Sequence, residues 1–162
     1  MREEQFERLY AEQAAPLLAF LVYRTGDRPL AEDLVADTFE RVLTARRGFD
    51  RRRASEKTWL YTIALNLLRD HIRRSAAGQR ATERVVAGAP EAQEGTDLRS
   101  VDHRDELQRA LAKLSEEERE AVALRFGADL TVPEIAALKG EKLTTVEGRV
   151  YRALRKLRGE LE

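Results

Sequence analysis

The chain of 162 residues has a composition typical of a helical protein, since 43% of its residues are hydrophobic, 36% are charged, and glycine and proline number only nine and four. It contains no cysteine, which excludes disulfides and thiolate chemistry, and its two isolated histidines, His71 and His103, argue against a metal centre. The N-terminal stretch is acidic where a signal peptide is basic, and its apolar positions are interrupted too often for a membrane span. We therefore expect an all-α cytoplasmic protein with no membrane contact of its own.

The formal net charge of zero hides a segregation of charge along the chain. Residues 1–45 carry five basic and nine acidic residues, whereas residues 46–74 carry nine basic and three acidic ones. Residues 144–162 again have an excess of base, with five basic against three acidic residues. Two basic zones in an acidic body are candidate sites for a polyanion, although a charged run is more often only a solvated face.

The first two predicted elements are amphipathic helices. Apolar residues recur with a helical period from residue 3 to about residue 24, and Gly26, Asp27 and Pro29 end this helix. A second helix is predicted over the segment PLAEDLVADTFERVLTARR, with its apolar residues on the inside. Its outer face is acidic and includes Glu32, Asp33, Asp37 and Glu40.

A third helix, over TWLYTIALNLLRDHIRR, follows the basic loop GFDRRRASEK, and Ser55 or Thr58 is suited to cap it. A helical period of about 100° per residue places one polar stripe beside its apolar arc, formed by Trp59, Thr62, Asn66, Arg69 and Arg73. An aromatic ring can stack on an unpaired base while arginines hold phosphates, so this stripe suits melted nucleic acid. The alternative is that Trp59 only anchors the edge of the core, which is the commoner role of an isolated tryptophan.

Residues 76–101 are rich in Ala, Gly, Ser, Gln and Glu and have no sustained apolar stripe, so they are predicted to form a flexible linker. The linker separates two small helical domains, residues 1–75 and 102–162. In the second domain, Leu107 to Leu114 mark one helix. Three capping boxes then start further helices, namely Ser115 with Glu118, Thr131 with Glu134, and Thr144 with Glu147.

The last two predicted helices, at about 132–139 and 145–158, are separated by a tight turn at Gly140, which is the spacing of a helix-turn-helix. The final helix turns its apolar residues inward, namely Val146, Val150, Ala153, Leu154 and Leu157. Its predicted outer face is cationic and comprises Thr145, Gly148, Arg149, Arg152, Arg155 and Lys156. Such a face suits a DNA major groove, whereas the alternative is a solvated helix whose cations match its dipole.

Three segments in order resemble motifs of the extracytoplasmic-function (ECF) sigma factors, the smallest bacterial initiation sigma factors of RNA polymerase. They are AEDLVADTFERV, TWLYTIALNLLRDHIRR and LTVPEIAALKGEKLTTVEGRVYRALRKLR. The resemblance covers nearly the whole chain. It implies a region 2 domain and a region 4 domain, joined by the linker without a third domain between them.

The resemblance also implies partners and site residues, with no cofactor, metal or catalytic residue. Core RNA polymerase would be bound at the clamp helices of its largest subunit and at its flap region, with contacts from Asp33, Asp37, Glu40 and Arg41. The −10 element of promoter DNA would be bound and melted by Phe49, Arg52, Arg53, Trp59, Thr62, Asn66, Arg69, Arg73 and Arg74. The −35 element would be read by Thr144, Thr145, Gly148, Arg149, Arg152, Arg155 and Lys156. An anti-sigma factor is a further partner that the resemblance admits.

Departures from the family pattern leave a second hypothesis open. Ala36 stands where the family has Gln, Leu65 stands where it has Arg, and Glu147 introduces an acid into the recognition helix. On this hypothesis the chain is a sigma-like decoy that sequesters an anti-sigma factor and does not initiate transcription. Lys139 and Glu141 also occupy positions around the turn that are usually apolar.

Two other classes of function are less favoured. A plain helix-turn-helix regulator needs neither the surface of Trp59 and Asn66 nor the acidic second helix. An enzyme is the least favoured class, because neither histidine nor any carboxylate pair has a partner at catalytic spacing.

Overall fold

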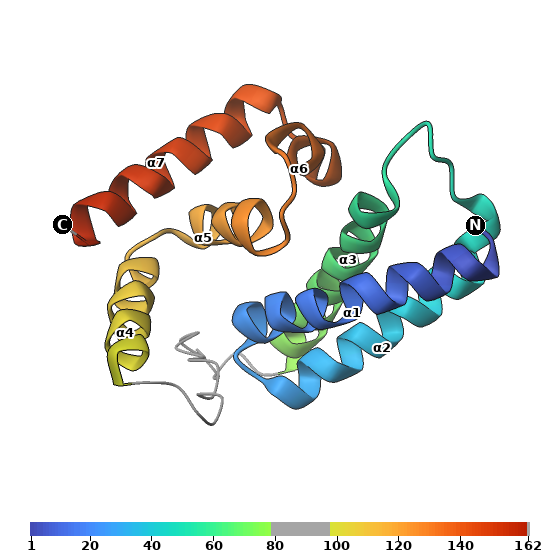
Figure 1. The fold of residues 1–162 in the computed structure, drawn as a ribbon, viewed down its shortest axis with the longest axis horizontal. Coiled ribbons are helices and arrows are strands. Elements are labelled where there is room, and N and C mark those ends of the chain that lie inside the picture. The colour runs from blue at the N-terminus through green and yellow to red at the C-terminus, as the bar shows by residue number, and fades with distance from the viewer. Residues whose placement is uncertain (79–97, 162) are drawn as a thin grey trace. The chain divides into compact units, whose positions relative to one another are not determined.

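The computed structural model describes residues 1–78 and 98–161, and these residues form helices and turns without a strand (Figure 1). The chain divides into two compact units, residues 1–86 and 87–162. The prediction of an all-α protein with two helical domains is therefore confirmed. The predicted linker, residues 76–101, lies mostly outside the described residues. Its first three positions belong to the helix before it and its last four to the helix after it.

Unit 1 is built from the helices α1 (Glu3–Thr25), α2 (Arg28–Ala45) and α3 (Glu56–Gly78), with the short 3-10 helix η1 (Arg46–Gly48) after α2. Helices α1 and α2 lie side by side in opposite directions (Figure 1). The turn between them is formed as the sequence predicts, since Gly26 has a left-handed φ of 66° and the Asp27 side chain accepts a hydrogen bond from the Leu30 amide at 3.1 Å. Ser55 caps α3 by accepting the Thr58 amide at 3.1 Å.

The core of unit 1 fixes which face of α3 is exposed. Apolar side chains from all three helices are buried together, and those of α3 are Leu60, Tyr61, Ala64, Leu65 and Leu68. Burial of each leucine stabilises the unit by about 1.5–3 kcal/mol. The polar stripe of α3 therefore faces away from this core.

Unit 2 contains α4 (Leu98–Ala112), α5 (Glu116–Val122), the π-helical turn η2 (Ala123–Gly127), α6 (Val132–Lys139) and α7 (Leu143–Leu161). Two of the three predicted capping boxes are confirmed. The hydroxyls of Ser115 and Thr131 each accept the amide of the glutamate three residues later, at 3.1 and 3.3 Å. Each glutamate carboxylate in turn accepts the amide of the capping residue at 3.0 Å.

The third predicted capping box is wrong. Helix α7 begins at Leu143, so Thr144 lies within the first turn and is not its N-cap. The amides of Thr145 and Val146 donate to the Lys142 carbonyl at 3.1 and 3.2 Å, which continues the helical pattern from that residue. The turn after α6 is short, so α7 starts before the threonine pair. Thr144 is therefore already helical and cannot act as the cap.

The predicted helix-turn-helix is confirmed by α6 and α7. Gly140 ends α6 with a left-handed φ of 66°, and its amide bonds back to the last turn of α6. Ile135 on α6 and Val146 on α7 are fully buried in unit 2. Further along α7, Ala153 and Leu157 pack in one cluster with Ala110 of α4 and with Leu114, which follows α4. The inner side of α7 is thus covered along its length, which leaves its opposite side exposed.

Across the described ranges, none of the helices combines the length and apolar character that a membrane crossing requires.

Candidate nucleic-acid and protein-binding surfaces

Trp59 and Phe49 form an aromatic pair at the start of α3. Their ring centroids are 4.9 Å apart with an interplanar angle of 39°, and both residues are half-buried. The contact attaches the end of η1 and the basic loop to α3. Trp59 therefore serves as an anchor for this loop, while part of its ring remains exposed.

The rest of the polar stripe of α3 faces solvent. Asn66, Arg69, Arg73 and Arg74 are exposed, and their side chains make no hydrogen bond or ion pair with other described residues. Thr62 differs from them, because it is half-buried and its hydroxyl donates to the Thr58 carbonyl at 2.8 Å. The structure thus brings an exposed amide and three guanidinium groups onto one side of α3.

The basic loop before α3 adds further cations. Asp50 shapes it by accepting the Arg52 amide on its side chain at 2.9 Å and the Arg53 amide on its carbonyl at 3.1 Å. Arg51 pairs with Glu56 at 3.2 Å, and Arg52 and Arg53 are exposed. Together with the α3 stripe they form a cationic surface of unit 1, made of Arg52, Arg53, Asn66, Arg69, Arg73 and Arg74.

The outer face of α2 is acidic, as the sequence predicts. Asp33, Asp37, Glu40 and Arg41 are all exposed, and Ala36 lies exposed among them. The opposite side of α2 is buried through Leu34, Phe39 and other core residues. Leu65, the other departure in this unit, is only 2% exposed, so at this position the chain has a core residue in place of the family's arginine.

The outer face of α7 carries polar and aromatic side chains. Thr144, Thr145, Arg152 and Arg155 are exposed there as predicted. Gly148 leaves room for Arg152, since a Cβ on Gly148 would lie 3.0 Å from Nη1 of Arg152. The guanidinium of Arg152 therefore rests against the α7 backbone in the space that a larger residue would fill.

Tyr151 belongs to the same outer face and was missed by the sequence analysis. It is 67% exposed, more than any other large hydrophobic residue in the described part of the chain. The signal that finds it is its angular position, about 140° from the buried Val146 at a helical period of about 100° per residue. We define the reading face of α7 as Thr144, Thr145, Glu147, Gly148, Tyr151, Arg152 and Arg155.

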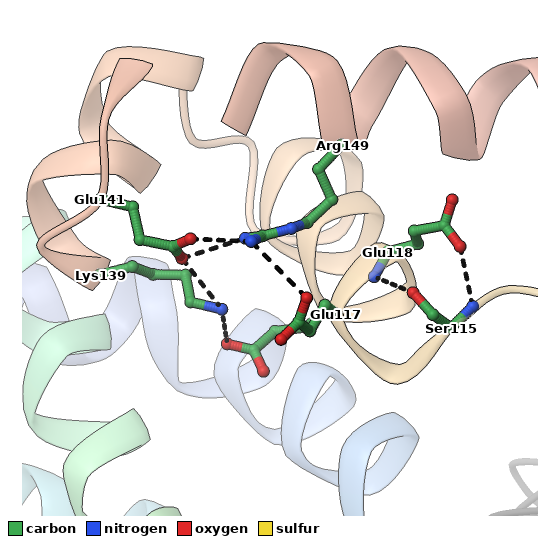
Figure 2. Close-up of polar contacts among 7 residues, drawn as sticks. Ser115, Glu117, Glu118, Lys139, Glu141 and Arg149 are labelled. Carbon is green, nitrogen blue, oxygen red and sulfur yellow. Dashed lines mark hydrogen bonds and ion pairs between the residues drawn. The ribbon is translucent and has the colours of Figure 1, made fainter. Parts of the chain in front are cut away.

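The prediction that Arg149 faces outward is wrong. Arg149 is 8% exposed, and its guanidinium donates two hydrogen bonds to the Glu141 carboxylate, at 3.0 and 2.7 Å (Figure 2). Glu117 lies 3.7 Å from the same guanidinium. Arg149 stands at the border of the apolar arc of α7, so the turn carboxylate can draw it inward. These contacts lower the pKa of the Glu141 carboxyl and raise the pKa of Arg149.

Lys139 and Glu141, the two charged residues around the turn, take part in the same set of ion pairs. The Lys139 ammonium lies 3.1 Å from Glu120 on α5 and 3.6 Å from Glu141 (Figure 2). Its side chain is only 11% exposed. The charges that depart from the family pattern are therefore paired with one another.

Lys156, which was expected to meet DNA backbone, stays half exposed, and its ammonium donates to Glu118 on α5 at 2.8 Å. One more prediction about α7 is wrong. Leu154 was expected to face inward, yet it is 39% exposed, because α7 packs against Ala110 and Leu114 through Ala153 and Leu157 instead. In the described part of the chain, no group of three or more acidic or histidine side chains is placed to hold a metal ion.

Comparisons with known proteins agree with this architecture. The family model for Sigma-70 region 2 matches residues 9–77, and that for Sigma-70, region 4 matches residues 104–157. The ECF RNA polymerase sigma factor RpoE of Cereibacter sphaeroides is 31% identical over 96% of this chain and 86% of its own length. The ECF RNA polymerase sigma factor BldN of Streptomyces coelicolor is 32% identical over 95% of this chain, which spans only 59% of that relative.

A solved structure is similar over nearly the whole chain. It is the sigma factor RpoE in complex with the anti-sigma factor NepR from Bartonella quintana, with 26% identity and a TM-score of 0.79 over 98% of this chain and 97% of that chain. The two family models together span both units, and the sequence identity extends through them. The chain therefore belongs to the ECF RNA polymerase sigma factors, which are transcription initiation factors and not enzymes.

Proposed function

We propose that this ECF sigma factor binds core RNA polymerase in the cytoplasm, directs it to −35 and −10 promoter elements and promotes DNA melting. The observation that carries the proposal is the presence of three chemically distinct exposed surfaces on two helical units. They are the acidic face of α2, the cationic surface of unit 1 and the reading face of α7. Neither a decoy nor a plain regulator needs all three.

The acidic face of α2 is the surface proposed to bind the clamp helices of the largest polymerase subunit. Asp33, Asp37 and Glu40 are exposed carboxylates, and Arg41 adds a cation beside them. Exposed charges of one sign steer association with a basic partner and contribute more to its rate and specificity than to affinity. Contact of unit 2 with the flap region is part of the same proposal.

The cationic surface of unit 1 is proposed to hold the melted −10 strand. Exposed arginines suit phosphates, Asn66 offers an amide for a base edge, and the exposed parts of Trp59 and Phe49 offer apolar surface for an extruded base. Thr62, which the resemblance also implies for the −10 element, is the weakest candidate, because its hydroxyl is already bonded within α3. Binding of the extruded base would offset an unstacking cost of a few kcal/mol and shift the opening equilibrium.

The reading face of α7 is proposed to enter the major groove of the −35 element. Arg152 and Arg155 are suited to guanine edges or phosphates, and the threonines of the first turn suit the backbone. Lys156 lies at the edge of the reading face and forms an ion pair with Glu118. Arg149, which the resemblance placed in this set, is left out of it because of its burial.

An anti-sigma factor is proposed as a further partner. The support is the similar RpoE of Bartonella quintana, whose structure was solved in complex with the anti-sigma factor NepR. Binding to such a partner fits both an initiator and a decoy, so it does not distinguish the two hypotheses.

Reconstituted transcription with core polymerase tests the proposal. Wild-type protein should form an open complex on a promoter fragment, detected by permanganate reactivity of unpaired thymines. The double variant Asp33→Ala/Asp37→Ala should lose polymerase binding, and Asn66→Ala should keep polymerase binding but lose melting. Glu12→Ala, which removes an exposed acid from α1, is the matched control. A wild-type protein that binds an anti-sigma factor but neither polymerase nor promoter would establish the decoy instead.

A further inference from the structure

We propose that Glu141 and Arg149 are positioning residues of the helix-turn-helix, which fix the direction of α7 and make no contact with DNA themselves. This inference rests on the proposed function, because it concerns how the reading face of α7 is presented to the −35 element. It assigns to Arg149 a role opposite to the one that its sequence position implies.

The ion pairs of Glu141 and Arg149 join three elements of unit 2 (Figure 2). Glu141 lies in the turn between α6 and α7, and its carboxylate accepts a hydrogen bond from each Nη atom of Arg149 on α7. Lys139 at the end of α6 bridges Glu141 to Glu120 on α5, and Glu117 on α5 approaches Arg149 at 3.7 Å. The start of α7 is thus tied both to the turn before it and to the helix beneath it.

The pairing of Arg149 with Glu141 is directional. A planar guanidinium that meets a carboxylate through two parallel bonds fixes an angle as well as a distance, which a lysine cannot do. The side chains of Arg149, Lys139 and Glu120 are only 10%, 11% and 12% exposed. Loss of one partner would therefore leave the other with only a longer ion pair in a site with little access to water, to Lys139 for Glu141 and to Glu117 for Arg149.

The position of the pair explains why it matters for DNA reading. Arg149 lies one residue after Gly148 and three before Arg152, in the part of α7 that carries the reading face. A recognition site works only when its groups are held within about 0.5 Å and 10–20° of the productive geometry. A tilt of α7 about the turn would displace Tyr151 and Arg152 together, without removing either side chain.

A DNA-binding experiment on the full chain separates positioning from direct contact. The affinity of the chain, assembled with core polymerase, is measured for a duplex bearing the −35 element and for an unrelated duplex, over a series of salt concentrations. The variants are Arg149→Met, Glu141→Gln and the double variant, with Arg152→Ala as the contact control. Thermal unfolding followed by circular dichroism shows whether each variant folds. If Arg149→Met does not fold, Glu141→Gln replaces it in the test, because it keeps an acceptor for Arg149.

We expect each single variant to lower the ratio of specific to non-specific affinity by about tenfold, and the double variant to lose little more than either. The slope of log affinity against log salt should stay as in the wild type for Arg149→Met, but fall by about one for Arg152→Ala. If Arg149→Met reduces the salt slope as much as Arg152→Ala does, Arg149 neutralises a phosphate, and the proposal is overturned. An unchanged specificity ratio, or additive losses in the double variant, would overturn it as well. A wild-type chain without preference for any duplex would instead refute the proposed function, and this inference with it.

Discussion

Oε1 of Glu118 accepts a hydrogen bond from Nζ of Lys156 at 2.8 Å, which ties the first turn of α5 to the C-terminal half of α7. The same Oε1 accepts the Ser115 amide at 3.0 Å in the capping box. One carboxylate oxygen therefore serves both the start of a helix and the packing of two helices. It also places a buried acid in a site that favours its ionised form.

The first prediction concerns acid stability. The bond from Lys156, followed by those from Ser115, lowers the pKa of Glu118 from 4.5 to about 2. Because the pKa is lower in the folded state, the contribution of Glu118 to stability is present above pH 4.5 and is lost as the pH falls towards 2. Lys156 is half exposed, so the pair contributes only about 1 kcal/mol. Urea unfolding of Glu118→Gln should show a flatter loss of stability between these pH values than the wild type, and an identical profile would contradict the assignment.

The second prediction concerns Tyr61, whose side chain is fully buried against Phe20 with ring centroids 5.5 Å apart. Its hydroxyl has no hydrogen-bond partner in the described part of the chain. An unsatisfied buried donor costs about 1–3 kcal/mol, so Tyr61→Phe should be neutral or stabilise unit 1 by about 1 kcal/mol. Thermal unfolding measures the effect, and Tyr10→Phe, at a 52% exposed tyrosine, is the control.

Alkaline titration gives an independent check on the same residue. Burial raises the pKa of Tyr61 from 10.0 to about 12. A pKa raised in the folded state means that this stability is present below pH 10 and is lost as the pH rises towards 12. The wild type should therefore lose stability in that range more steeply than Tyr61→Phe, as measured by urea unfolding at each pH. Ultraviolet absorbance of tyrosinate follows the ionisation itself. A clear destabilisation by Tyr61→Phe at neutral pH would show that the hydroxyl has a partner.

The third prediction uses Trp59, the single tryptophan of the chain, as a fluorescent reporter. Phe49 covers part of its ring, so Phe49→Ala should shift the emission to longer wavelength and increase quenching by acrylamide. The lost aromatic contact should destabilise unit 1 by about 1 kcal/mol. Phe6→Ala, which removes a ring that meets Phe39 at 6.2 Å, destabilises the unit without touching Trp59. Emission unchanged by Phe49→Ala would mean that the loop is attached to α3 in another way.

Most helix boundaries and the division into two helical units follow from local signals in the sequence. Ser115 with Glu118 and Thr131 with Glu134 are recognisable because both members of each capping box lie within one turn of helix. Thr144 with Glu147 has the same spacing and does not cap, because the preceding turn starts α7 earlier. A local pattern predicts a cap only when the backbone on its N-terminal side is extended, which depends on the neighbouring turn.

The environment of Arg149 could not be predicted from local spacing. Its partners Glu117 and Glu141 belong to other elements, and the resemblance to the family pointed to the exposed cationic face. Tyr151, in contrast, was predictable from the helical period alone, since it stands opposite the buried residues. A pattern of cationic residues does not single it out, because its side chain carries no charge.

The last prediction concerns Glu147, an exposed acid on the otherwise uncharged or cationic reading face. Its carboxylate repels phosphates, yet it can accept a hydrogen bond from the N4 amino group of cytosine in the major groove. We expect Glu147→Ala to raise the affinity for unrelated duplex DNA and to lower the discrimination at one C·G base pair of the −35 element by about 1–3 kcal/mol. Binding to a set of duplexes with single base-pair changes measures both effects. Glu160→Gln removes one negative charge from the same helix at a residue that pairs with Lys113, and so corrects for the change in net charge. If both variants raise non-specific affinity equally and neither alters discrimination at any base pair, Glu147 acts only as a charge and does not read a base.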